Sequence, residues 1–173
     1  QAGCLRRTLV KFAIMKRLLL SLIVTLCSVF AWGQALSAVG VGNKCLIKNN
    51  FAAAKQVFRD NALYPAIREN STDYVVSIDE DLFASIKANS NKTIKEVSFL
   101  IGSYYQDRLE KDMNKLGYKC LSKKLFYVTL GNGAVVPQST YGVGNKRMLI
   151  RDIGNGMLQL IFKRQATSTT KRK

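Results

Sequence analysis

Apolar residues recur along this chain at two different spacings. In residues 50–63, Phe51, Ala54, Val57 and Phe58 follow helical steps, and Asn49 or Asn50 before them is a residue type that caps helices. A longer stretch over residues 93–116 repeats the same steps of three or four and stops at a glycine; its members are Ile94, Val97, Ile101, Tyr105, Leu109, Met113 and Leu116. The pattern predicts one helix over 50–63 and one long helix over 93–116.

Two shorter segments lie around these helices. Asp79, Glu80 and Asp81 precede residues 82–88, and acidic residues suit the first turn of a helix, so a short helix is expected there. The segment 40–44 repeats the residues found at 142–146. If the repeat is a turn followed by a strand, residues 45–48 form a strand; the alternative is a chance match.

After Gly117 the apolar spacing changes from helical to alternating. Strands are predicted over residues 118–121, 124–130, 147–153 and 157–163. Asn155-Gly156 separates the last two, and Asn-Gly is a strong hairpin signal. The expected fold class is therefore α+β, with N-terminal helices packed on a C-terminal antiparallel β-meander.

The N-terminal region has the pattern of a targeting segment. Lys16 and Arg17 precede a 13-residue, largely apolar run, and small residues follow at 31, 33 and 35, which is the build of a secretory signal peptide over 15–35. The run is shorter than the roughly 20 residues of a membrane-spanning helix, so no transmembrane span is expected after cleavage. The predicted organisation is an upstream, non-native extension at 1–14, the signal peptide at 15–35, one α+β domain at 36–164 and a flexible basic tail at 165–173.

Composition and charge narrow the chemistry. The 173 residues include no histidine, which excludes Ser-His-Asp and Cys-His catalysis and the common zinc sites. The formal net charge is +16. Residues 118–164 hold eight basic residues against Asp152 alone, whereas residues 36–117 are nearly neutral, with 11 basic and 10 acidic residues. No metal or other cofactor is expected.

Two cysteines remain after the predicted cleavage. Cys45 and Cys120 form an even pair, and in an oxidising compartment such a pair predicts a disulfide bond. The alternative is two buried free thiols. The predicted signal peptide at 15–35 indicates a secreted or periplasmic location, which is an oxidising compartment where a disulfide bond can form.

The basic strands carry the main functional hypothesis. If Phe126, Val128 and Leu130 face the helices, alternation places a cationic set with one aromatic ring on the opposite face: Tyr127, Arg147, Arg151 and Lys163. This face is predicted to bind an anionic glycan, a lipid head group or an acidic protein surface; the alternative is a solvated face. Export disfavours nucleic acid as the partner.

A second hypothesis uses carboxylates. Residues 69–81 contain Glu69 and Asp73 together with the acidic run at 79–81, and glycoside hydrolysis needs a pair of carboxyl groups and no histidine. Helix capping and turns explain the same residues. The sequence therefore favours a small, exported, non-enzymatic binding protein, with a secreted carboxylate-dependent glycan hydrolase as the alternative.

Overall fold

The computed structural model describes residues 37–165, apart from 80–81 and 123–125. It begins with α2 (Ala38–Lys48) and α3 (Phe51–Asp60). The Ser37 side chain caps α2 by accepting from the backbone N–H of Gly40 at 3.0 Å, and Asn50 caps α3 in the same way. The helix predicted over 50–63 is confirmed. The strand predicted at 45–48 is wrong, because these residues form the last turn of α2.

Four antiparallel strands follow: β1 (Ala66–Glu69), β2 (Asp73–Asp79), β3 (Leu82–Ala88) and β4 (Ile94–Gly102). The short helix predicted at 82–88 is therefore wrong. So is the first part of the long helix predicted over 93–116. Only its later part is helical, as the 3-10 turn η1 (Ser103–Tyr105) and α4 (Gln106–Lys115).

The remaining strands are β5 (Lys119–Cys120), β6 (Phe126–Thr129), β7 (Val135–Val143), β8 (Lys146–Gly154) and β9 (Met157–Arg164). The predicted hairpin is confirmed, since β8 and β9 pair antiparallel around Asn155. The sequence pattern did not predict β7. The α+β class with an antiparallel meander is also confirmed.

The strands of both halves join in one sheet. Within the described ranges the order is β1-β2-β3-β4-β9-β8-β7-β5, with β6 paired to β7. The strand β9 lies between β4 and β8, so it connects the first meander to the second. The expectation of helices packed on a purely C-terminal sheet is corrected, because four of the nine described strands precede α4.

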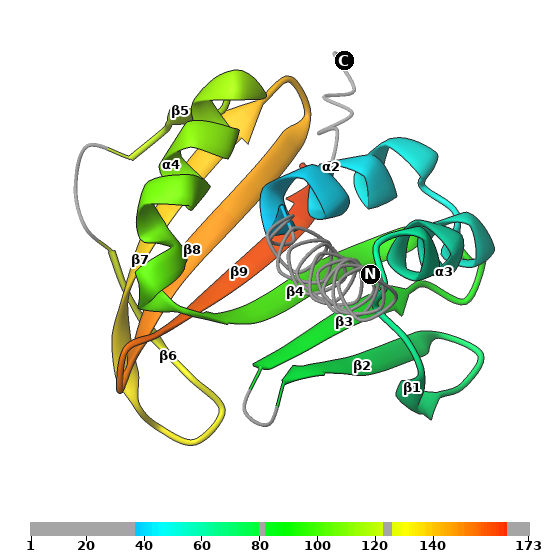
Figure 1. Cartoon of the computed structure of the whole chain (residues 1–173). Coiled ribbons are helices and arrows are strands. Elements are labelled where there is room, and N and C mark those ends of the chain that lie inside the picture. Colours follow the sequence, from blue (N-terminus) through cyan, green and yellow to red (C-terminus); the bar gives the residue numbers. More distant parts are fainter. Residues whose placement is uncertain (1–36, 80–81, 123–125, 166–173) are drawn as a thin grey trace, which may run out of the picture. The chain divides into compact units, whose positions relative to one another are not determined.

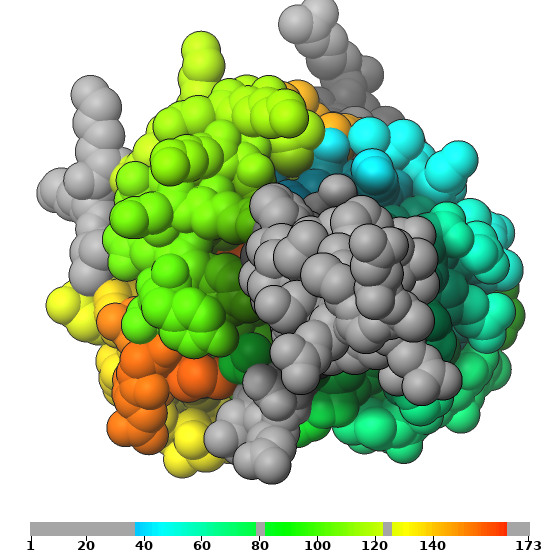
Figure 2. Space-filling model, in the orientation of Figure 1, coloured from blue at the N-terminus to red at the C-terminus, as the bar shows by residue number. Residues whose placement is uncertain are grey.

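The helices α2, α3 and α4 all cover one face of this sheet (Figure 1). In the same orientation, the space-filling view shows helix side chains forming much of this surface, with the turn between β8 and β9 at its rim (Figure 2). Beneath them three buried aromatic rings pack in a row. The ring centroids of Phe58 and Phe99 lie 5.8 Å apart, and those of Phe99 and Phe162 lie 5.9 Å apart. The core therefore sits between the helices and the sheet, and the other face of the sheet carries no helix of the described chain.

The predicted leader at 15–35 and extension at 1–14 lie outside the described residues, as do residues 166–173 of the predicted tail. Among the helices that are described, none combines the length and the apolar character that crossing a membrane requires.

Candidate functional site

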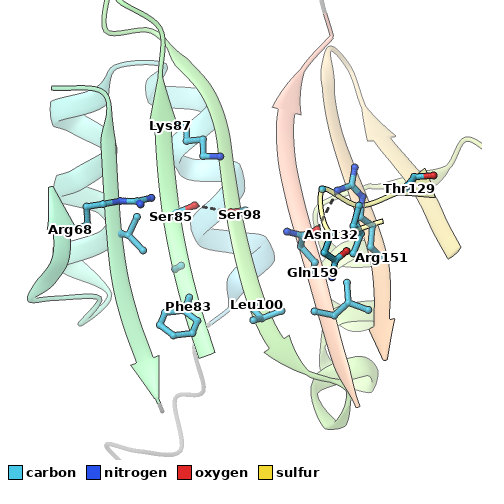
Figure 3. Close-up of a pocket in the computed structure, with 15 residues that line it drawn as sticks. Arg68, Phe83, Ser85, Lys87, Ser98, Leu100, Thr129, Asn132, Arg151 and Gln159 are labelled. Carbon is cyan, nitrogen blue, oxygen red and sulfur yellow. Dashed lines mark hydrogen bonds between the residues drawn. The ribbon is translucent and has the colours of Figure 1, made fainter. Parts of the chain in front are cut away.

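The sheet face opposite the helices, called here the open face, carries a groove of about 570 Å³ (Figure 3). Its walls come from β1–β4 on one side and from β8 and β9 on the other, while residues 129–132 at the end of β6 also line it. Three lining side chains are cationic: Arg68, Lys87 and Arg151. The described lining contains no carboxylate.

Strand alternation places these side chains together. In β3 the buried Ala84 and Ile86 face the helices, so Phe83, Ser85 and Lys87 face the groove. The same rule applied to β8 buries Met148 and turns Arg151 outward. Cross-strand pairing then aligns one continuous set of residues from β3 to β7: Phe83, Leu100, Gln159, Arg151 and Gln138.

Arg151 is the most firmly held cation of the groove. Its Nε donates to the Oε1 of Gln138 on β7 at 2.8 Å, and its Nη1 donates to the Oε1 of Gln159 on β9 at 3.2 Å. These glutamines flank Arg151 in register on the two neighbouring strands. The guanidinium is half-buried and has no carboxylate partner among the described residues, so its charge is positioned but not neutralised.

Across the groove, hydroxyl groups meet on β3 and β4. The Ser85 and Ser98 hydroxyl oxygens lie 2.7 Å apart and share one hydrogen bond, which is drawn in Figure 3. A hydroxyl bonded to another hydroxyl has no base to activate it as a nucleophile. This pair therefore offers hydrogen bonds to a ligand rather than the machinery of covalent catalysis.

The other two cations are exposed and approach the groove from β1 and β3. In Figure 3, Arg68 extends from the β1 side toward Ser85, and Lys87 stands farther along β3. Lys87 has one carboxylate nearby in the sheet, because Glu96 is its register partner on β4. Glu96 does not line the groove.

The predicted site residues are only partly brought together. Arg151 lies in the groove, but Arg147 and Lys163 pair with each other about four residues, or roughly 13 Å, farther along the β8–β9 hairpin. Arg147 donates to the carbonyl oxygens of Gly144 and Lys146 at 2.8 and 2.9 Å and to the side chain of Gln165, so local acceptors occupy it.

Tyr127 lies on the other face, which corrects the predicted orientation of β6. It pairs with Pro137, which shares a face of β7 with Ser139 and Tyr141. Those residues pair with Ile150 and Met148, on the helix side of β8. Phe126 and Val128 pair with Gln138 and Val136, which lie on the open face of β7, and Thr129 at the end of β6 lines the groove. Both faces of β6 are largely exposed, so alternation alone gave no signal for its orientation.

Two cations of the groove were missed by sequence reasoning: Arg68 and Lys87. Lys87 was assigned to a helix, and Arg68 lies in a four-residue strand that the pattern did not reveal. The available signal was the alternation of Ala84, Ile86 and Ala88, which places Lys87 on the outward face.

The two cysteines predicted to form a disulfide bond are both free thiols in this structure. Cys45 is fully buried on the core side of α2, and this burial raises the pKa of its thiol to about 12. Cys120 is exposed on β5, and its thiol donates to the backbone oxygen of Ser122. The two thiols therefore lie in different environments: Cys45 on the buried face of α2, and Cys120 on the exposed strand β5.

The acidic residues of 69–81 do not assemble at the groove. The Glu69 carboxylate forms an ion pair with Lys55 of α3 at 2.6 Å, and Asp73 accepts from Asn70 in the turn before β2. Glu80 and Asp81 lie outside the described residues. Glu69 and Asp73 therefore serve local contacts.

A smaller cavity of about 280 Å³ lies between α4 and the sheet, and its charge is opposite to that of the groove. Glu110 and Asp152 line it, and its described lining has no cation. Burial raises the pKa of Tyr141 in this cavity, and the nearby Cys120 and Glu110 add to the effect. Cationic and acidic cavities are thus segregated on opposite sides of the sheet.

No protein-family model matches this chain, and no curated protein or solved structure is significantly similar to it.

Proposed function

We propose that this chain is a non-enzymatic binding protein that holds an anionic group in the open-face groove. The observation that carries the proposal is the set of three cations, Arg68, Lys87 and Arg151, around one groove whose described lining has no carboxylate. A groove of about 570 Å³ falls within the usual range for small-ligand sites.

Electrostatics supports an anion as the ligand. Cations that line a concave surface reinforce one another and attract the opposite charge over several ångströms. The half-buried guanidinium of Arg151 is less screened by water and salt than an exposed charge. The acidic cavity lies on the helix side of the sheet, so its carboxylates do not line the groove.

Two observations favour binding over catalysis. The hydroxyl groups of Ser85 and Ser98 bond to each other rather than to a base. The described lining also offers no carboxyl group for general acid–base chemistry. With the secretory pattern at 15–35, the proposal places the protein in the cell envelope or outside the cell.

The test is titration of the chain with an oligomer of a uronic acid, and separately with vesicles that contain an acidic phospholipid, each at low and at physiological ionic strength. We expect binding of one of these anions to weaken steeply as salt rises. The double variant Arg68→Ser/Lys87→Ser should bind at least about tenfold more weakly, since two unit charges at the groove are lost.

The matched control is Lys44→Ser/Lys111→Ser, which removes two exposed positive charges from α2 and α4 on the other face. Its affinity should stay within about twofold of the unmodified chain. Equal losses in both double variants would assign the attraction to net charge and contradict the groove, and binding that ignores salt would contradict the electrostatic basis of the proposal.

A further inference from the structure

We infer that the groove binds an acidic saccharide, and that Arg151, held by Gln138 and Gln159, binds its acid group. The inference rests on the proposed function and narrows it to one class of ligand. It follows from the hydrogen-bonding capacity that remains in the donor row, defined here as Gln138, Arg151 and Gln159.

In the donor row, the side-chain oxygens of both glutamines already accept hydrogen bonds from Arg151. A guanidinium can only donate, so each glutamine must turn its Oε1 toward Arg151 and its Nε2 amide away from that contact. Arg151 spends two of its five N–H groups on these bonds, which leaves three. The row therefore presents donors to whatever enters the groove.

A surface of fixed donors selects for acceptors. Two parallel N–H groups of a guanidinium match the two oxygens of a carboxylate, sulfate or phosphate, and such charge-assisted pairs are about twice as strong as neutral hydrogen bonds. Because neighbouring strands hold Arg151 from both sides, little side-chain entropy is lost when the ligand binds. The row thus favours an oxyanion over a neutral polar group.

The neighbouring residues extend this preference to a saccharide. Phe83 and Leu100 continue the same cross-strand line on β3 and β4, and they offer an apolar surface to the C–H face of a sugar ring. The hydroxyls of Ser85 and Ser98 lie two residues farther along these strands, on the same face of the sheet. One acidic sugar could thus place its acid group at the donor row, the apolar face of its ring on Phe83 and Leu100, and its hydroxyl groups near the two serines.

The decisive variant is Arg151→Lys, which keeps the positive charge but removes the two parallel N–H donors of the guanidinium. A lysine ammonium cannot bond both glutamines and still present two parallel donors. We expect the affinity for a uronic acid oligomer to fall about tenfold or more, which corresponds to the loss of a charge-assisted pair. The matched control is Arg59→Lys, the same substitution at an exposed residue of α3 outside the groove, and it should change the affinity less than about threefold.

A second variant separates recognition from stability. Gln159→Glu keeps an acceptor for Arg151 and nearly the same shape, but it replaces a ligand-facing donor with a negative charge. It should abolish binding of the oligomer while the melting temperature is retained. A purely structural role for the row predicts the reverse, with stability lost in Arg151→Lys and affinity retained in the Gln159→Glu protein.

The ligand arms use a uronic acid oligomer, its methyl ester and a sulfated oligosaccharide of the same length, beside acidic vesicles. Binding of the acid form with loss on esterification supports the inference, and the sulfated arm shows whether the guanidinium discriminates between oxyanions. Wild-type affinity in Arg151→Lys, or binding to vesicles alone, would overturn the inference and leave the proposed function standing. Equal binding of acid and ester would overturn both, because the ester carries no charge. If neither anion binds, the proposed function itself fails.

Discussion

Gly42 permits the close approach of α2 to the sheet, and substitution there tests the packing directly. A Cβ at this position would lie 2.6–2.7 Å from three ring atoms of Phe162 on β9. Normal carbon–carbon contacts lie at about 3.5–4.0 Å, so the ring or the helix would have to move by about 1 Å. Gly42→Ala is therefore an overpacking substitution.

The expected cost can be estimated from opposing effects. Alanine is better than glycine inside a helix by about 1 kcal/mol, while overpacking a core costs about 1–3 kcal/mol. The upper part of that range applies, because Phe162 is fully buried and packs edge-on against Phe99 at 5.9 Å. We expect a net destabilisation of about 1–2 kcal/mol, which corresponds to roughly 3–6 °C in the melting temperature.

Urea unfolding followed by circular dichroism measures this difference. Gly131→Ala is the control, since a Cβ there meets no heavy atom within 4 Å, and it should change stability by less than about 0.5 kcal/mol. The double variant Gly42→Ala/Phe162→Leu should lose less than the sum of its single variants, because the smaller side chain admits the methyl group. A Gly42→Ala protein as stable as the original, or additive losses in the double variant, would refute the proposed contact.

Other residues give independent predictions. The Tyr118 hydroxyl is buried without a hydrogen-bond partner in the described structure, so Tyr118→Phe should raise the free energy of unfolding by about 1 kcal/mol in urea titration. A thiol reagent should label Cys120 in the native protein and Cys45 only after unfolding, as peptide mass mapping can show. Because burial raises the pKa of Cys45 from 9.0 to about 12, the unfolded chain releases this proton first, and stability should fall as pH rises from about 9 to 12; Cys45→Ala should reduce that fall. Ser37 caps α2 and donates to Asp112 of α4 at 2.6 Å, so Ser37→Ala should cost about 1–2 kcal/mol, and no loss in thermal unfolding would contradict both contacts.

The long predicted helix shows why periodicity alone was insufficient. Ile94, Val97 and Ile101 fit helical steps, but Val97, Phe99 and Ile101 also alternate, and the structure buries this second set. The odd interval between Ile94 and Val97 arises because the β3–β4 register shifts between Lys87 and Ala88. A single bulge thus makes a strand resemble a helix in sequence.

The second half of the chain was easier to predict. Asn155-Gly156 set the turn, and Met148, Leu160 and Phe162 on the flanking strands are fully buried, so alternation assigned their faces correctly. Arg151 was found for that reason. Its partners on β1 and β3 were not, because the groove forms only when two meanders that are distant in sequence pair through β4 and β9. No local pattern records that pairing.

The position of β9 determines when, during synthesis, the chain becomes able to bind a ligand in the groove. Residues 66–102 leave the ribosome long before residues 157–164, yet β4 keeps an unpaired edge until β9 arrives beside it. Ser98 and Arg151 stand on opposite sides of that seam and form a single groove only once it is closed. A nascent or prematurely ended chain that lacks β9 would thus hold β1–β4 and β8 without a closed groove between them, so ligand capture would report that synthesis had passed β9.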